Sequence, residues 1–262
     1  MRIIVQKFGG SSLATQAARE AAIARVLAAR QQGLQVVVVV SALGRRGAPY
    51  ATDTLQDLVG GANGLPRREL DLILSCGEII AAGVLASELR RQLPAVTCLT
   101  GGQAGIITNN EYGAAEIIEV RPDRIRTLLE AGYVVVVAGF QGCSPTGEIT
   151  TLGRGGSDTT AAALGAALGA CRVEIYTDVN GIATTDPKLT PNAPVLSWLD
   201  YSTALELSQQ GARVLHPRAI EWLQKHDIPL LVRNTRGSHP GTRIIPCFWT
   251  KHGCQPENTV AI

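Results

Sequence analysis

Two uninterrupted apolar runs stand out in the pattern of hydrophobic and polar positions along the chain. Residues 35–40 read Gln-Val-Val-Val-Val-Val, and residues 133–138 read Tyr-Val-Val-Val-Val-Ala. A strand with one face in water alternates apolar and polar side chains, whereas a strand that is buried on both faces does not. The two runs therefore predict strands at the centre of a parallel sheet that is covered on both sides.

Shorter runs of β-branched residues predict further strands, and helical spacing separates them. After Thr15 the apolar positions recur as on one face of an amphipathic helix, which we expect to end at Gly33. We expect further strands at 2–6, 96–99, 106–108, 117–120, 173–176 and 228–232, the last of which closes the sheet, and further helices at 69–91, 122–132, 202–210 and 217–226. The alternation of these elements predicts an α/β fold.

Composition narrows the class of protein. Of the 262 residues, 45% are hydrophobic and 18% are charged, and the net charge is +2. A chain of this size buries a substantial core, either as one large α/β domain or as two lobes. The charge balance indicates neither disorder nor a nucleic-acid-binding surface, so we expect small molecules or other proteins as partners.

The lack of a recognisable targeting signal and the spacing of the cysteines favour a cytoplasmic location. The sequence has no run of about 18 apolar residues, and it enters its first strand without a signal-peptide core, so we expect a cytoplasmic protein without a membrane partner. The six cysteines form no CxxC pair and no Cys/His metal spacing. We therefore expect reduced thiols and no metal site built by the protein.

The stretch at 151–160, Thr-Leu-Gly-Arg-Gly-Gly-Ser-Asp-Thr-Thr, is the leading candidate for a ligand site. Its adjacent glycines allow a ligand to approach the backbone, and the small residues after them predict a tightly packed helix with free N–H groups at its start. Arg154 is suited to hold a carboxylate or phosphate, and Asp158 a cation or ammonium group. The same pattern also fits a plain turn followed by a helix cap.

A second glycine turn follows the first strand. Residues 7–12 read Lys-Phe-Gly-Gly-Ser-Ser and precede a helix. This arrangement places backbone donors around a phosphate, with the Lys7 ammonium beside them. A plain turn with a surface lysine fits equally well. The turn has neither the spacing of a Walker A loop nor that of a dinucleotide-binding GxGxxG turn.

Three more polar residues are candidates because of their positions. Ser41 and Asp178 each follow a strand, where ligands of open parallel sheets collect, and Asp178 fits either a ribose contact or a turn cap. Glu78 lies in a helix between a glycine and two isoleucines, so it is either a buried carboxylate that needs a cationic partner or a solvated helical glutamate. For Arg45 and Arg46 we expect a solvated loop.

Seven motifs carry a resemblance to a known family. They are KFGGSS from Lys7, SCGE from Ser75, AGFQG from Ala138, TTLGRGGSDTTA from Thr150, YTDVNGI from Tyr176, TTDPK from Thr184 and GARVLHPRAIE from Gly211. In this order and approximate spacing, the chain resembles the catalytic domains of aspartokinases, in the amino acid kinase superfamily, up to about Ile244. The resemblance implies an open αβα sandwich with a mainly parallel central sheet.

The resemblance also implies two lobes that bind different ligands, and a particular reaction. An N-terminal lobe, residues 1–145, would hold the phosphoryl acceptor and the phosphate loop, and a C-terminal lobe, residues 146–262, the nucleotide; turn residues at 143–149 favour that boundary. The implied reaction is phosphorylation of the β-carboxylate of L-aspartate by MgATP, the first step towards lysine, threonine and methionine. A carboxylate is already a nucleophile, so no general base is needed, and Mg²⁺ would be held mainly by ATP phosphates and water.

The site residues implied by the resemblance form three groups. Arg154 would clamp the α-carboxylate of aspartate, Glu78 would bind its α-ammonium, and Asp158 would hold Lys7 in register. The catalytic group is Lys7, Gly9, Gly10, Asp158 and Arg213; the acceptor group is Ser41, Thr52, Glu78, Arg154, Gly156 and Ser157; the nucleotide group is Lys7, Phe8, Gly9, Gly10, Thr177, Asp178, Lys188, Arg213 and Val214.

The chain departs from the aspartokinase pattern in two places. Ala183, Lys188 and Arg213 stand where the family usually has Tyr, Arg and Lys, so we expect altered nucleotide affinity. Only 18 residues follow Ile244, so we expect no ACT domain and no feedback regulation in cis. An unregulated kinase, a separate regulatory subunit and a catalytic lobe taken from a longer protein all remain open, and we expect a homodimer. Two other functions also stay open, a kinase for another amino-acid-like carboxylate and a non-catalytic subunit.

Overall fold

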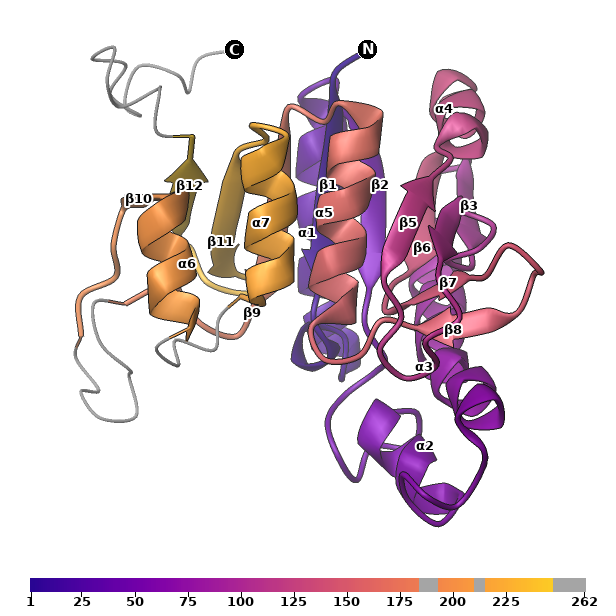
Figure 1. Ribbon diagram of the computed structural model, residues 1–262. Coiled ribbons are helices and arrows are strands. Elements are labelled where there is room, and N and C mark those ends of the chain that lie inside the picture. The colour runs from indigo at the N-terminus through magenta and orange to yellow at the C-terminus, as the bar shows by residue number, and fades with distance from the viewer. Residues whose placement is uncertain (184–192, 210–214, 247–262) are drawn as a thin grey trace.

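The computed structural model describes residues 1–183, 193–209 and 215–246, in which helices cover both faces of a central sheet (Figure 1). The strands are β1 Ile3–Phe8, β2 Gln35–Val40, β3 Val96–Leu99, β4 Ile106–Thr108, β5 Ile117–Val120, β6 Val134–Ala138, β7 Gln141–Cys143, β8 Ile149–Thr151, β9 Arg172–Thr177, β10 Trp198–Asp200, β11 Leu230–Asn234 and β12 Thr242–Ile245. The helices are α1 Gln16–Gln31, α2 Thr52–Leu58, α3 Arg67–Leu89, α4 Asp123–Glu130, α5 Gly156–Leu168, α6 Tyr201–Gln209 and α7 Pro217–Lys225, and η1 Gly10–Ser12 is a short 3₁₀ turn.

The larger sheet has eight strands in the order β10-β12-β11-β9-β1-β2-β6-β3. From β3 to β11 every neighbouring pair is parallel, whereas β12 runs antiparallel to β11 and parallel to β10. The first strand, β1, therefore lies inside the sheet between β2 and β9. Because ligands of open parallel sheets bind at the carboxyl ends of the strands, the glycine turn after β1 opens at the middle of that edge.

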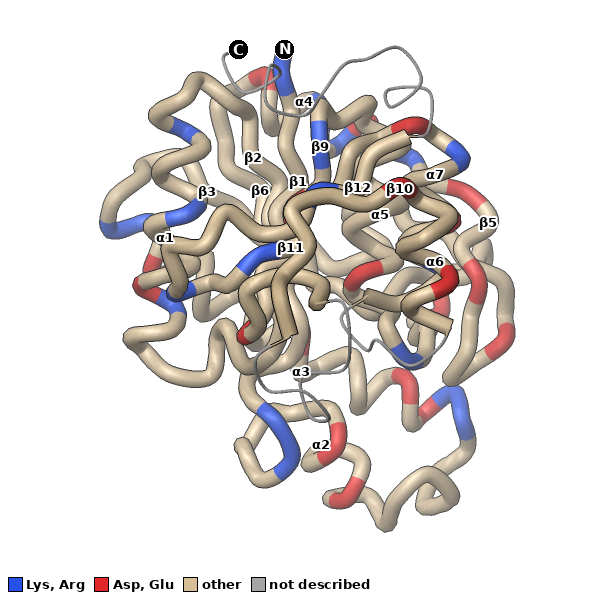
Figure 2. The backbone as a smooth tube through the Cα atoms, turned by 90° about the vertical axis from the view of Figure 1, so that its left-hand side faces the viewer, with Lys and Arg blue, Asp and Glu red and all other residues tan. Residues whose placement is uncertain are grey.

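Both faces of this sheet are buried, which explains the uniform valine runs. Val37 and Val39 of β2 belong to the core cluster that includes residues of α4, α5, α6 and α7 on one face, and Val36 and Val38 belong to the cluster with α1 and α3 on the other. Figure 2 shows β2 and β6 passing through the molecule without a charged residue. The prediction of an open αβα sandwich with buried parallel strands is confirmed.

Four short strands form a second sheet in the order β5-β4-β7-β8. Its strands β7 and β8 pair antiparallel as a hairpin, and the backbone N–H of Ser144 donates to the carbonyl of Glu148 at 2.8 Å in the turn. The lobe boundary predicted after residue 145 falls in this turn, so the hairpin joins residues from both sides of it. The division of the chain into two lobes stays a prediction.

The predicted strands and helices occur at the expected places, with ends that differ by a few residues. One expectation was wrong, because the strand predicted at 228–232 does not close the sheet. β12 follows it and pairs with it antiparallel, and β10 lies beyond β12 at the edge. These two short strands, Trp-Leu-Asp and Thr-Arg-Ile-Ile, were not predicted from the sequence.

One helix among the described residues, α3, is long and apolar enough to cross a membrane by length and composition. In this fold 56% of its most apolar window is buried inside the protein. The buried side contacts β2, β3 and β6. Packing against the sheet therefore accounts for the apolar character of this helix.

Candidate active site

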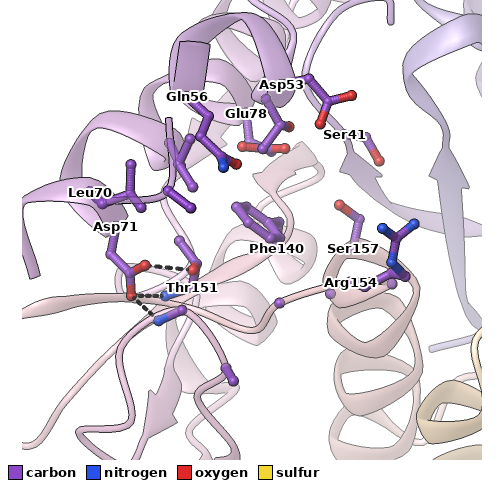
Figure 3. A pocket seen from close by; sticks show the side chains of 18 of the residues that line it. Ser41, Asp53, Gln56, Leu70, Asp71, Glu78, Phe140, Thr151, Arg154 and Ser157 are labelled. Carbon is purple, nitrogen blue, oxygen red and sulfur yellow. Dashed lines mark hydrogen bonds between the residues drawn. The ribbon is translucent and has the colours of Figure 1, made fainter. Parts of the chain in front are cut away.

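A cavity of about 730 Å³ lies at the carboxyl edge of the larger sheet (Figure 3). Lys7, Ser41 and Phe140 reach it from the ends of β1, β2 and β6. Figure 3 shows Glu78 on one wall and, opposite, Arg154 and Ser157 at the N-terminal end of α5. The predicted acceptor residues Ser41, Thr52, Glu78, Arg154, Gly156 and Ser157 all line the cavity, together with Lys7 and Asp158.

A cation and a carboxylate form the centre of this edge. The Nζ atom of Lys7 lies 2.6 Å from Oδ1 of Asp158, and each side chain is 12% exposed. Asp158 stands in the first turn of α5, where the free N–H groups and the helix dipole favour a negative charge. The pair therefore presents a fixed ammonium group at the wall of the cavity.

The glycine turn before α5 needs its glycines. Gly155 has φ 72°, and a Cβ there would overlap the ring of His216. A Cβ on Gly156 would lie 2.9 Å from Cβ of Leu152 and 3.0 Å from the Phe140 ring. This close packing lets α5 begin at Gly156, two residues after Arg154, whose exposed side chain faces the cavity.

Glu78 is buried rather than solvated, with 2% of its surface exposed. Its Oε1 accepts from the backbone N–H of Ala42 at 3.0 Å, whereas its Oε2 has no hydrogen-bond partner among the described residues. Burial raises the pKa of Glu78 to about 8, and the charge of Lys7 acts in the opposite direction. An acid with one unsatisfied oxygen at a cavity wall is suited to a cationic ligand, whose charge would lower this pKa.

The glycine that precedes Glu78, Gly77, is closely approached by the loop after β2. A Cβ on Gly77 would lie 2.8 Å from the carbonyl oxygen of Tyr50 and 2.9 Å from Cβ of Ala42. The loop after β2 can approach α3 only because Gly77 has no side chain. This approach also brings the N–H of Ala42 within reach of Glu78.

The glycine turn after β1 is held tightly. A Cβ on Gly10 would overlap the carbonyl oxygen of Gly44, and the N–H of Gly44 donates to the carbonyl of Gly10 at 3.0 Å. The N–H of Gly9 donates to the carbonyl of Tyr176 at 3.2 Å. Phe8 is fully buried with its ring centroid 4.8 Å from that of Tyr176, and it does not line the cavity.

The predicted nucleotide residues Thr177 and Asp178 lie at the end of β9 and do not line the cavity. Asp178 accepts from the Thr177 hydroxyl at 3.1 Å, and it pairs with Arg45 at 2.5 Å. The pair is exposed, with 74% of Arg45 and 51% of Asp178 accessible, as a solvated loop predicts. Lys188, Arg213 and Val214 lie outside the described residues.

Asp71 of α3 is a buried acid of the cavity wall that was not predicted from the sequence. Its side chain is 1% exposed and accepts hydrogen bonds from Thr151 and Gly113. Nothing in the local sequence distinguishes it from the other acids of that helix. Its partners are 80 and 42 residues away along the chain, so only the fold reveals them.

The fold and the site define a class of protein. A parallel sheet whose carboxyl edge carries a lysine, glycine turns and a helix N-terminus is typical of α/β proteins that bind phosphate groups. Residues 2–234 match the amino acid kinase family, and the chain belongs to that family.

Comparison with individual proteins narrows the similarity to one group within this family. Aspartokinase 1 of Bacillus subtilis is 46% identical over 254 residues, which is 97% of this chain and 63% of that protein. An aspartate kinase structure from Synechocystis superposes with a TM-score of 0.80 at 44% identity, covering 93% of this chain and 40% of that one. E. coli aspartokinase III in complex with aspartate and ADP gives a TM-score of 0.80 at 27% identity, covering 94% of this chain and 65% of that one. The resemblance to aspartokinases is therefore confirmed, and the chain spans less than two thirds of each of these relatives.

Proposed function

We propose that the chain catalyses the ATP-dependent phosphorylation of the β-carboxylate of L-aspartate to give 4-phospho-L-aspartate. The observation that carries the proposal is the convergence of Lys7, Glu78 and Arg154 on one cavity. Aspartate has two carboxylates and one ammonium group, so two cations and one anion are the complement it requires. The similarity to proteins named aspartokinase supports the same conclusion.

Each charged residue has one role in this proposal. Arg154 binds the α-carboxylate with two parallel hydrogen bonds, and the free Oε2 of Glu78 accepts from the α-ammonium. Lys7 neutralises negative charge that moves with the phosphoryl group, while Asp158 holds the lysine in place. Ser41, Thr52 and Ser157 add hydrogen bonds from the cavity wall. An oxygen of the β-carboxylate attacks the γ-phosphorus while the bond from that phosphorus to the β,γ-bridging oxygen breaks and ADP leaves, so the protein supplies no general base.

ATP would approach from the glycine turn after β1, with Thr177 and Asp178 beside it. Mg²⁺ would enter with the nucleotide, held mainly by phosphate oxygens and water, because this ion dehydrates reluctantly. The carboxylate of Asp158 beside Lys7 is a ligand type that Mg²⁺ takes together with phosphates, so the residues present fit a magnesium–nucleotide complex. Bound Mg²⁺ would neutralise phosphate charge.

The wider setting of the enzyme is proposed on the same resemblance. The residues up to 145 would serve the acceptor, those from 146 onward the nucleotide, and the protein would act in the cytoplasm as a homodimer. Size-exclusion chromatography with light scattering measures the oligomeric state, and a monomer at micromolar concentration would contradict the last point.

Hydroxylamine trapping tests the reaction. The protein is incubated with MgATP, hydroxylamine and one acceptor at a time from L-aspartate, D-aspartate, L-glutamate and N-acetylglutamate. Acyl phosphates give hydroxamates under mild conditions, whereas phosphate esters do not. We expect a hydroxamate with L-aspartate. A hydroxamate with another acceptor alone would identify a different carboxylate kinase, and none from a folded protein that fails to bind ATP would favour a non-catalytic subunit.

A further inference from the structure

Asp71 and Glu78 lie seven residues apart on α3, which is about two helical turns, so they share one face of the helix. Both are almost fully buried, and both line the cavity. Glu78 faces the ligand with a free oxygen, whereas Asp71 uses its oxygens for the protein itself. The two acids on this face of α3 therefore differ in role: Glu78 is available to a ligand, and Asp71 bonds to other parts of the protein.

The carboxylate of Asp71 joins the end of β8 to the loop at Gly113. Its Oδ2 accepts from the backbone N–H of Thr151 at 2.7 Å and from that of Gly113 at 3.0 Å, and its Oδ1 accepts from the Thr151 hydroxyl at 2.7 Å (Figure 3). A carboxylate is an acceptor-only group with several lone pairs, which three donors from different directions require. Neither segment belongs to α3, so these bonds fix the end of β8 and the loop at Gly113 to the helix that carries Glu78.

Thr151 is the last residue of β8 and stands three positions before Arg154. Its carbonyl accepts from the N–H of Ala115 at 2.9 Å, and the N–H of the next residue, Leu152, donates to the carbonyl of Phe140 at 2.8 Å. The segment that leads to Arg154 is therefore anchored at its start. Asp71 is the anchor that connects this segment to α3.

We propose that Asp71 is a positioning residue that sets the separation between Glu78 and Arg154, and thereby the length of acceptor that the cavity selects. The inference rests on the proposed function, in which these two residues hold the α-ammonium and the α-carboxylate. L-Glutamate has one methylene more than L-aspartate, so its side-chain carboxylate arrives correctly only if the α-amino acid group shifts. A firmly anchored Arg154 prevents that shift.

Two pairs of variants test the proposal. Asp71→Ala removes all three hydrogen bonds, whereas Asp71→Asn can still accept from both N–H groups through its oxygen and donate to the threonine hydroxyl. Thr151→Val removes only the side-chain bond. Thr150→Val is its matched control, because Thr150 points to the other face of the strand and pairs with the Thr108 hydroxyl at 2.5 Å.

The readout is the KM for L-aspartate, the KM for ATP and the ratio of kcat/KM for L-aspartate to that for L-glutamate, measured by hydroxamate formation. We expect Asp71→Ala to raise the KM for aspartate about tenfold or more, with a smaller change in the KM for ATP and a lower aspartate-to-glutamate ratio. Thr151→Val should act in the same direction more weakly, Asp71→Asn should restore most of the affinity, and Thr150→Val should change neither ratio nor KM.

Equal rises in both KM values, or the same effect from Thr150→Val as from Thr151→Val, would overturn the proposal and make Asp71 a general structural residue. If Asp71→Ala does not fold, the threonine pair and Asp71→Asn still decide. Wild-type protein without activity towards L-aspartate would refute the proposed function instead. Amide hydrogen exchange needs no substrate, and Thr151→Val must then increase exchange at residues 151–156 relative to Thr150→Val; unchanged exchange would overturn the anchoring role.

Discussion

The ammonium group of Lys7 lies 2.6 Å from the carboxylate of Asp158, which joins the end of β1 to the first turn of α5. Both side chains are mostly shielded from water, so the attraction between them is screened less than that of a surface pair. The pair holds a flexible lysine side chain in one place before any ligand arrives. In the proposed reaction this preorganised charge is where the transferred phosphoryl group needs it.

Replacing Lys7 tests this role directly. We expect Lys7→Ala to reduce kcat about a hundredfold or more while the protein stays folded, because it removes a charge that stabilises the transition state. Hydroxamate formation measures turnover, and circular dichroism measures folding. Lys225→Ala is the control, since Lys225 is an exposed residue in the last turn of α7. Normal turnover by folded Lys7→Ala protein would remove this lysine from the mechanism.

The environment of Glu78 predicts a selective effect on the acceptor. Glu78→Gln keeps the shape of the side chain but not its charge, so the KM for L-aspartate should rise about tenfold or more while the KM for ATP changes little. Glu88→Gln serves as control, because Glu88 lies in the same helix but pairs with Arg19 at 2.9 Å. A similar rise in both KM values would refute the assignment of Glu78 to the ammonium group.

The raised pKa of Glu78, about 8, predicts a pH dependence of acceptor binding. Below pH 8 most of the empty protein carries a neutral Glu78, which must lose its proton to pair with an ammonium group. The KM for L-aspartate should therefore fall as the pH rises from 6.5 to 8.5, and binding at neutral pH should release a proton. Calorimetry in buffers of different ionisation enthalpy measures that release. A Glu78→Gln protein with the same pH profile would show that another group titrates.

The same shift has a consequence for stability, with a definite sign. The pKa of Glu78 is higher in the folded protein than its ordinary value of 4.5, so the folded state binds more protons between those values. The contribution of Glu78 is therefore present at low pH and is lost as the pH rises towards 8. The denaturation midpoint of ligand-free protein should fall over this range, and it should fall less in Glu78→Gln. An equal fall in both proteins would assign the effect to other groups, such as Asp71, whose pKa is also raised by burial.

Replacing individual glycines by alanine tests whether a glycine is required because neighbouring atoms approach it closely. Gly10→Ala should destabilise the protein by about 1–3 kcal/mol or more, because the new Cβ would overlap the backbone carbonyls of Ala42 and Gly44. Gly83→Ala in α3 meets nothing within 4 Å and should stabilise the protein by up to about 1 kcal/mol. Chemical denaturation measures both. Equal stability of the two variants would contradict the close approach at Gly10.

Much of the fold could be predicted because burial on both faces of a sheet leaves a direct trace in sequence. The runs at 35–40 and 133–138 have no polar position, and β2 and β6 occupy them. The glycine turns also carried their own signal, since a close approach excludes every other residue. The edge strands β10 and β12 were not predicted, although the equally short β4 was, because Trp-Leu-Asp and Thr-Arg-Ile-Ile lack the unbroken run of β-branched residues found in Ile-Ile-Thr.

The candidate site was predictable only in part. Sequence reasoning singled out Lys7, Glu78, Arg154 and Asp158, and the fold brings all four to one cavity. It could not decide whether Glu78 was buried, because helical spacing does not show what covers a given face. It did not find Asp71 at all.

The sequence by itself determined the kinds of element, their order and the motifs at the ends of the strands, since these depend on residues that are near one another in the chain. Tertiary structure alone decided the charge states and distances that chemistry requires. The unsatisfied oxygen of Glu78, the pairing of Lys7 with Asp158 and the bonds of Asp71 to Thr151 and Gly113 all depend on groups far apart in sequence. Burial and electrostatic attraction act through space, so only the folded chain specifies them.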